Sequence, residues 1–395
     1  MSMKIKRICQ KMLILMTCVL LAAPVLSVQA LQVVQGILIY EKSIDEKCMS
    51  MTLEEKIAQM FIITPEALTG VSPVTETGDI TEASFQQYPV GGLVYFRENL
   101  ISREQTIRLL DRMQKISKQR TGLPIFLTVD EEGGTVSRLY GGGITDIPYI
   151  GDMYTIGASG DPEQAYTAGN TIGTYLKNLG FNVDFAPVAD VFSNVSNTVI
   201  GNRSFGNDAE LVSEMVGMAV KGLQDKGIRA TLKHFPGHGD TAEDSHSGYA
   251  SSYKNLEQLE ECEFLPFRTG IEAGADFIMA GHISLPNVLG DQTPVSLSYK
   301  MLTEILRNQL GFDGIIITDA LNMGAIANYY SSAEAAVSAV EAGADILLMP
   351  RSFEEAYNGI KNAVYDGRIS EERIDESVMR ILRVKKKIAN LQEDE

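Results

Sequence analysis

The sequence of 395 residues predicts an α/β fold, namely a (β/α)8 barrel formed by a single domain over residues 51–390. Eight short apolar runs alternate with longer segments of helical period, which is typical of parallel strands joined by helices. The runs are continuous rather than alternating, as expected for strands that are covered on both faces. An open doubly wound sheet is the alternative, but no glycine-rich phosphate-binding sequence follows the first run.

The predicted elements follow one another in a regular order. The strands are expected at residues 59–63, 92–96, 125–129, 183–188, 230–234, 277–280, 314–318 and 346–349. The main helices are expected at residues 103–118, 162–179, 209–226, 256–273, 300–310 and 332–342, and one or two closing helices at 353–388. Thr52, with Glu55 three residues later, predicts a capped helix start before the first strand. Most of these helices end near a glycine, as helix C-termini tend to do.

The first fifty residues differ in character from the rest. Four basic residues among the first eleven precede an apolar run over residues 12–26, and Val28-Gln29-Ala30 resembles a signal-peptidase site. We therefore expect a signal peptide over residues 1–30, a linker over 31–50 and a secreted or cell-surface protein. An uncleaved membrane anchor is the alternative, because a second apolar stretch covers residues 31–40.

Composition excludes some classes of partner. Apolar residues make up 45% of the chain, enough for a substantial core. Without residues 1–30, which carry four basic and no acidic side chains, 30 basic residues face 51 acidic ones, a net charge of −21. Such a balance argues against nucleic acid and anionic membrane surfaces as partners, and a monomer is expected. Only Cys48 and Cys262 remain in that part of the chain, and their spacing does not say whether they pair.

Ionisable residues follow several of the predicted strands. In a (β/α)8 barrel the active site lies at the C-terminal ends of the strands, and ionisable side chains are rare in buried parallel strands. Several of them at one rim therefore predict a functional site there. The residues at or just past these strand ends are Asp130, Asp190, Lys233, His234, His282 and Asp319.

A histidine-rich loop follows the fifth strand. Three of the four histidines of the chain, His234, His238 and His246, fall within residues 233–246. Histidine is suited to proton transfer near neutral pH, and Asp244 could orient His246 and stabilise its charged form. Asp319 at a strand tip could then serve as a nucleophile. A carboxylate facing a proton donor is the minimal arrangement for retaining glycoside hydrolysis, although the donor here would be histidine.

Five motifs carry a resemblance to a known family. They are D-E-E-G-G-T-V-S-R at 130–138, N-R-S-F-G at 202–206, K-H-F-P-G-H-G at 233–239, D-S-H at 244–246 and T-D-A-L at 318–321. In this order they closely resemble the β-N-acetylglucosaminidases of glycoside hydrolase family 3, over residues 50–390. Two features depart from the family pattern. Glu131 stands where many relatives carry glutamine, and the histidine-rich loop is unusually acidic.

The resemblance implies roles for eight residues. It implies Asp319 as the catalytic nucleophile, His246 as the acid/base and Asp244 as the partner of His246. It also implies contacts to the N-acetylglucosamine unit from Asp130, Arg138, Arg203, Lys233 and His234. Family members without the Asp-Ser-His motif take their acid from a second domain, for which this chain has no room. His238 and Asp240 are expected to hold the loop through internal hydrogen bonds.

The expected activity is the release of terminal β-linked N-acetylglucosamine from cell-wall muropeptides or chitin oligosaccharides, without a metal or organic cofactor. A phosphorylase on the same scaffold is the first alternative, although the acidic loop should repel phosphate. A metal-dependent hydrolase using His234, His238 and His246 is the second, but Pro236 and Gly237 prevent a helix that would align the first two. An inactive sugar-binding module is the third, and it would be expected to lack Asp319 or His246.

Overall fold

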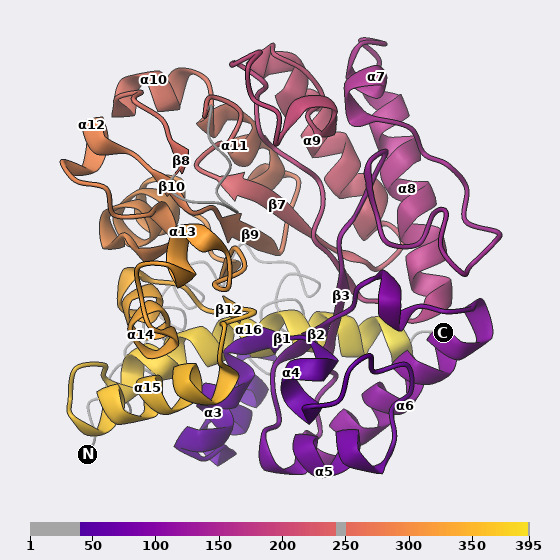
Figure 1. Cartoon of the computed structure of the whole chain (residues 1–395), viewed down its shortest axis with the longest axis vertical. Helices are drawn as coiled ribbons and strands as arrows, with labels where there is room; N and C mark the ends of the chain where they lie inside the picture. The colour runs from indigo at the N-terminus through magenta and orange to yellow at the C-terminus, as the bar shows by residue number, and fades with distance from the viewer. Residues whose placement is uncertain (1–39, 242–249, 394–395) are drawn as a thin grey trace, which may run out of the picture. The chain divides into compact units, whose positions relative to one another are not determined.

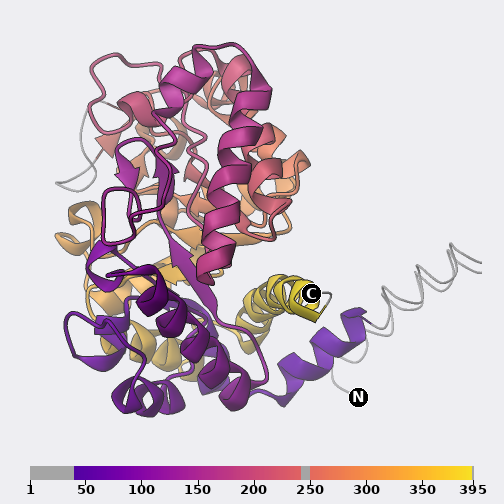
Figure 2. The same cartoon turned by 90° about the vertical axis from the view of Figure 1, so that its right-hand side faces the viewer.

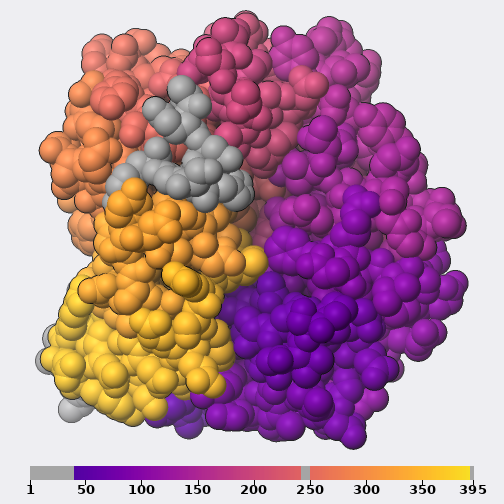
Figure 3. All heavy atoms as spheres, viewed as in Figure 1, coloured from indigo at the N-terminus to yellow at the C-terminus, as the bar shows by residue number. Residues whose placement is uncertain are grey.

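The computed structural model describes residues 40–241 and 250–393 and confirms the predicted barrel (Figure 1). Eight parallel strands follow one another in the order in which they occur in the chain. The first strand pairs with both the second and the eighth, and a bridge between Ile317 and Ile346 joins the seventh to the eighth. Segments from the two ends of the barrel sequence therefore meet, and in Figure 3 the indigo surface borders the yellow one.

The eight strands lie where the apolar runs predict them. They are β1 (Phe61–Ile63), β2 (Gly92–Val94), β3 (Phe126–Val129), β6 (Val183–Asp184), β7 (Arg229–Phe235), β9 (Phe277–Ala280), β11 (Ile315–Thr318) and β12 (Leu347–Leu348). Every residue in them is buried, as the continuous apolar pattern requires. Two short pairs lie outside this sheet: β4 (Glu131–Gly133) with β5 (Val136–Ser137), antiparallel, and β8 (Ala250–Ser251) with β10 (Ile283–Ser284), parallel.

Helices surround the strands. The α-helices before and within the first half are α3 (Leu53–Gln59), α4 (Pro65–Thr69), α5 (Asp79–Gln87), α6 (Arg103–Thr121), α7 (Met153–Gly157), α8 (Pro162–Leu179) and α9 (Ala209–Gln224). Those of the second half are α10 (Leu256–Glu261), α11 (Phe264–Glu272), α12 (Pro286–Leu289), α13 (Gly324–Ala327), α14 (Ser332–Ala342), α15 (Phe353–Tyr365) and α16 (Glu371–Glu393), with a π-helix at Lys300–Gln309. Short 3-10 turns lie at Arg97–Asn99, Gly201–Arg203 and Val295–Leu297. The predicted capping box of Thr52 and Glu55 is present at the start of α3.

Two of the boundaries that differ from the sequence expectation have a clear physical cause. The helix expected over residues 256–273 is broken at Cys262, whose backbone is not helical, into α10 and α11. Pro266 explains the break, because in a continuous helix its ring would clash with the carbonyl group of residue 262, four positions earlier. Strand β6 ends at Asp184 rather than at Val188, because Pro187 has no N–H group to donate to a neighbouring strand.

Helix α16 closes the N-terminal end of the barrel (Figures 1 and 2). Lys385 Nζ donates a hydrogen bond of 2.7 Å to Gln59 Oε1, just before β1, and lies 5.0 Å from the ring centre of Phe126, the first residue of β3. Arg380 Nη1 donates to Asp345 Oδ1, just before β12, at 2.9 Å. These contacts all involve the beginnings of strands, so the opposite end remains for the functional site.

The chain divides at residue 50, and residues 51–395 form one compact unit. Residues 40–50 form a helix that belongs to the other unit. The expected signal peptide and the first part of the expected linker lie outside the described residues. Within residues 40–241 and 250–393, no helix combines the length and the apolarity needed to span a bilayer.

Candidate active site

The C-terminal ends of the barrel strands surround a cavity of about 320 Å³. This volume is in the range of small-molecule binding sites. Of the eight residues with roles implied by the resemblance, six line the cavity: Asp130, Arg138, Arg203, Lys233, His234 and Asp319. These six residues lie on or follow four different strands, β3, β6, β7 and β11, so side chains from several strand ends converge, as the barrel topology predicts.

Asp319 lies directly after β11. Its backbone N–H donates to the carbonyl oxygen of Ala280 at 2.8 Å, and its Oδ1 accepts the N–H of Ala320 at 2.7 Å, so both backbone and carboxylate are fixed. Burial alone would raise the pKa of Asp319, but the charges of His234 and His282 and the Ala320 hydrogen bond hold that pKa below its usual value. The carboxylate is therefore ionised at neutral pH, the state that a nucleophile requires.

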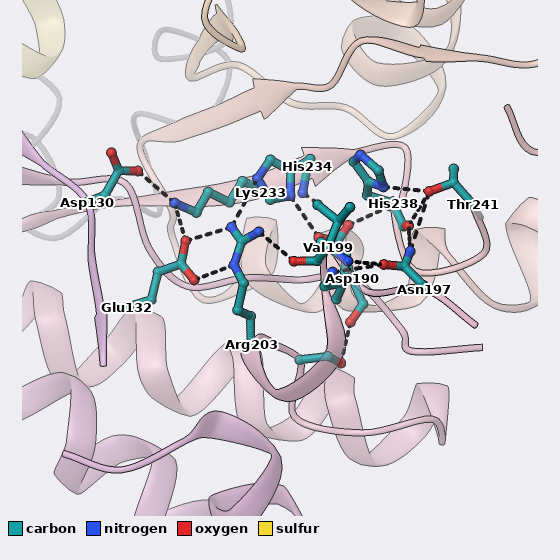
Figure 4. A network of polar contacts seen from close by, with 12 residues as sticks. Asp130, Glu132, Asp190, Asn197, Val199, Arg203, Lys233, His234, His238 and Thr241 are labelled. Atoms are coloured by element: carbon teal, nitrogen blue, oxygen red, sulfur yellow. Dashed lines mark hydrogen bonds and ion pairs between the residues drawn. The ribbon is translucent and has the colours of Figure 1, made fainter. Parts of the chain in front are cut away.

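Lys233, on β7, is the centre of a buried ion network (Figure 4). Its Nζ lies 2.9 Å from Asp130 Oδ1 and 2.6 Å from Glu132 Oε1, and its side chain is 2% exposed. Burial would lower the pKa of Lys233, but the two carboxylates raise it above its usual value. Lys233 therefore stays protonated and holds the cavity-facing Asp130 in place.

Arg203 joins the same network from the turn Gly201–Arg203. Its Nε and Nη2 donate to the two oxygens of Glu132, each at 2.8 Å. Burial works against the charge on Glu132, but Lys233 and Arg203 hold the pKa of Glu132 well below its usual value. Glu132 lies within the motif at 130–138, but the resemblance gives it no role. Lys233 and Arg203 are both expected in one pocket, and two cations there require a second carboxylate besides Asp130.

Arg138 enters the cavity from the β4–β5 hairpin. Its Nη2 lies 3.5 Å from Asp130 Oδ2, and its guanidinium carbon lies 5.2 Å from the ring centre of Phe96. The contact with Asp130 is long for a hydrogen bond, and the side chain of Arg138 is one-third exposed. Arg138 is thus held loosely against the cavity wall, and its remaining donors can bind a ligand.

His234 follows Lys233 on β7 and is oriented by Asp190. His234 Nδ1 lies 2.8 Å from Asp190 Oδ2, while Asp190 Oδ1 accepts the N–H groups of His234 at 3.1 Å and His238 at 2.6 Å. The ring atom Nε2 of His234 lies 3.5 Å from Arg203 Nη2 (Figure 4). Asp190, which the sequence predicts at the rim of the barrel, is fully buried behind His234, and it supports the imidazole rather than facing the cavity.

The beginning of the histidine-rich loop is held by internal hydrogen bonds, as expected. His238 Nδ1 lies 2.7 Å from Thr241 Oγ1, and Asp240 Oδ2 accepts the hydroxyl of Ser252 at 2.5 Å. Burial, then His234, lowers the pKa of His238. A Cβ atom at Gly239 would lie 1.8 Å from the carbonyl oxygen of Val191, so only glycine allows the loop to approach the segment after β6 this closely.

The two remaining predicted residues, Asp244 and His246, lie outside the described residues, and their roles stay predictions. His282, to which the resemblance gives no role, is buried beside the end of β11: its Nδ1 lies 2.7 Å from Ser296 Oγ and its Nε2 lies 3.0 Å from the carbonyl oxygen of Ala320. Within residues 40–241 and 250–393, no group of three or more His, Cys, Asp and Glu side chains could hold a metal ion.

Comparison with known proteins identifies relatives of the whole barrel. Residues 52–384 match the model of the glycosyl hydrolase family 3 N terminal domain. A protein named β-hexosaminidase from Xylella fastidiosa strain 9a5c is 34% identical over 266 residues, which cover 67% of this chain and 77% of that protein. β-Hexosaminidase A from Pseudoalteromonas piscicida is 34% identical over 327 residues, 76% of this chain and 54% of the relative.

A solved structure is similar as well. It is described as a glycoside hydrolase family 3 β-N-acetylglucosaminidase from Paenibacillus sp. str. FPU-7. It is 41% identical with a TM-score of 0.80, over 86% of this chain and 63% of that one. This chain thus spans somewhat more than half the length of both the Pseudoalteromonas and the Paenibacillus relatives.

Proposed function

This chain belongs to glycosyl hydrolase family 3, and from that membership we propose that it releases terminal, non-reducing β-linked N-acetylglucosamine with retention of configuration. The observation that carries the proposal is Asp319, an ionised carboxylate fixed at a strand end and facing a cavity that holds Asp130, Lys233 and Arg203. Charged side chains in fixed positions suit the hydroxyl and acetamido groups of a sugar, because each can make directional hydrogen bonds to them.

The proposed reaction has two steps. Asp319 attacks the anomeric carbon while His246 gives a proton to the leaving oxygen, and the bond between sugar and aglycone breaks. His246 then takes a proton from water, whose oxygen attacks the same carbon and releases Asp319. Asp244 would orient His246 for both transfers. Asp130, Arg138, Arg203, Lys233 and His234 would bind the sugar during both steps.

Hydrolysis is favoured over phosphorolysis by the charge balance of the cavity. Among the described residues, each of the three lysine and arginine side chains that line it is paired with a carboxylate: Lys233 with Asp130 and Glu132, Arg203 with Glu132, and Arg138 with Asp130. A phosphate ion would have to compete with these carboxylates, whereas neutral water does not.

We further propose that the protein acts outside the cytoplasm as a monomer on muropeptides or chitin oligosaccharides. The basic and apolar residues before position 30 support export. N-terminal sequencing of protein collected from the culture medium tests this, because a start at or near Leu31 is expected and intact residues 1–30 would contradict it.

The activity is tested with p-nitrophenyl β-glycosides that differ only in the 2-acetamido group. We expect rapid turnover of the N-acetylglucosaminide and little turnover of the glucoside. The reverse preference would refute the proposed substrate specificity. Asp319→Asn is expected to fold and to lose several orders of magnitude in kcat, since a neutral amide cannot form the glycosyl-enzyme. If the variant keeps more than about a tenth of the turnover, Asp319 lowers the activation free energy by less than about 1.4 kcal/mol, and this would exclude it as the nucleophile.

A further inference from the structure

Glu131 lies between two residues of the site, Asp130 and Glu132, but points away from the cavity. It is 1% exposed and does not line the cavity. Its Oε1 accepts the hydroxyl groups of Ser137 at 2.6 Å and Tyr175 at 2.9 Å. Its Oε2 accepts the backbone N–H groups of Arg138 at 2.8 Å and Leu139 at 3.2 Å. One carboxylate thus accepts four hydrogen bonds, three of them from consecutive residues.

These three residues form the end of the β4–β5 hairpin that carries Arg138 into the cavity. Ser137 Oγ also accepts the N–H of Tyr140 at 2.9 Å, which extends the same set of bonds along the chain. The outer side of the hairpin end is held by Arg97, whose Nη2 donates to the carbonyl oxygens of Ser137 at 2.7 Å and Tyr140 at 3.0 Å. The backbone of Arg138 is therefore fixed from both sides, and its inner support is Glu131.

The side chain of Arg138, by contrast, has weak support of its own. Its contact with Asp130 is 3.5 Å long, and its buried Nε has no hydrogen-bond partner in the described part of the chain. The position of the guanidinium thus depends on where the backbone of Arg138 is held. We propose that Glu131 is a positioning residue for Arg138, which it holds through two backbone N–H groups so that the guanidinium reaches the sugar. The proposal rests on the proposed function in that Arg138 binds the substrate.

The charge of Glu131 is a separate matter from its acceptor atoms. The titratable groups that face it are Tyr175 of α8 and Asp184 of β6, whose Oδ1 accepts the N–H of Glu131 at 3.0 Å. Burial raises the pKa of Glu131 despite its four hydrogen bonds, and burial and then Glu131 raise the pKa of Asp184. A glutamine in place of Glu131 could accept both backbone N–H groups through its oxygen and donate to the two hydroxyl groups. It would keep the position and remove the charge.

Kinetics on the p-nitrophenyl N-acetylglucosaminide distinguish the effects of the acceptor atoms, the charge and the bulk of the Glu131 side chain. Glu131→Met has similar bulk and no strong acceptor, and we expect it to raise KM on the order of tenfold with kcat changed less than about twofold. Glu131→Gln should keep KM within about twofold of wild type. The matched control is Tyr175→Phe, which removes a donor to the same carboxylate from helix α8 rather than from the hairpin, and should leave KM unchanged.

A double-mutant cycle shows whether the effect passes through Arg138. In the Arg138→Ala background, Glu131→Met should add no further rise in KM beyond about twofold. An unchanged KM in Glu131→Met alone, or the same tenfold rise in the Arg138→Ala background, would overturn the proposal. Equal effects of Glu131→Met and Tyr175→Phe would also overturn it, because they would indicate a general loss of packing.

Hydrogen exchange tests the positioning without any substrate. The amides of Arg138 and Leu139 should be protected in the wild-type protein and should exchange at least about tenfold faster in Glu131→Met, with the barrel strands unaffected. If the wild-type amides of these two residues exchange as fast as those of the neighbouring turn 141–143, Glu131 does not hold them, even if Glu131→Met fails to fold. A protein without glycosidase activity but with this exchange pattern would refute the proposed function and leave the positioning role intact.

Discussion

Glu132 offers the most quantitative test of how the site is built. It is the shared counter-ion of Lys233 and Arg203, with its side chain 2% exposed and three contacts of 2.6 to 2.8 Å. The substitution Glu132→Gln keeps the shape and removes the charge. Lys233 then retains only Asp130, and Arg203 loses its bidentate partner in a site from which water is largely excluded.

The loss of folding stability expected for Glu132→Gln follows from the burial of its ion pairs. Removing one partner of a buried ion pair destabilises a protein by about 3–5 kcal/mol, because the remaining charge is left without compensation. An exposed pair contributes only about 0–1 kcal/mol. The chain contains a matched control: Arg368 binds Glu341 in the same bidentate geometry, at 2.6 Å for both contacts, but the two side chains are 55% and 36% exposed. Glu341→Gln should therefore cost less than about 1 kcal/mol.

The free energy of unfolding is measured by urea denaturation followed by far-ultraviolet circular dichroism, since the chain contains no tryptophan. The loss in Glu132→Gln should be insensitive to added salt, whereas that in Glu341→Gln should shrink at high ionic strength. Equal costs in the two variants would refute the reasoning, since the bidentate arginine contact is shared, while burial and the second cation, Lys233, are found only at Glu132.

The pH dependence has a defined sign. The pKa of Glu132 is lower in the folded state than its ordinary value of 4.5, so its stabilisation is present above that value and is lost as pH falls through the folded pKa. The stability gap between wild type and Glu132→Gln should therefore be constant from neutral pH down to about 4.5 and narrow below it. A gap that widens on acidification would contradict the assignment of Glu132 as an ionised counter-ion.

Three further predictions concern the proposed acid, a buried lysine and metal dependence. His246→Ala should slow the hydrolysis of substrates with poor leaving groups far more than that of a dinitrophenyl glycoside. Added azide should restore turnover, with a β-glycosyl azide as product. Equal slowing of both kinds of substrate without azide rescue would mean that His246 only binds substrate. Burial lowers the pKa of Lys385 from its ordinary value of 10.5 to about 7. Lys385→Met should therefore be more stable than wild type below pH 7, and this advantage should disappear above about pH 10.5. Melting temperatures of the two proteins measured against pH check the sign. Dialysis against EDTA should change neither activity nor melting temperature, and an activity restored by added zinc would favour the metal-dependent alternative.

The barrel can be predicted from the order and pattern of residues along the chain. Strands such as β11 and β9 are covered on both faces, so they read as unbroken apolar runs, and helices such as α8 and α14 end where glycine follows. These signals depend only on residues a few positions apart. They also place Asp130, Lys233, His234 and Asp319 at strand ends, and parallel topology alone then brings them to one rim. For this reason the cavity could be anticipated residue by residue.

Which charged side chains pair with one another depends on the complete fold. Glu132 and Lys233 are about a hundred positions apart, and Arg203 comes from a turn with no periodic pattern, so no local signal joins the three. The same holds for Asp190, which looked like a cavity carboxylate and instead lies behind His234, and for Glu131, whose neighbours in sequence face the cavity while it supports the hairpin. Whether a charge at a strand end faces the ligand or a buried partner depends on side-chain direction and on the closure of the barrel. The pairing of these charges is therefore fixed only once all eight strands are in place.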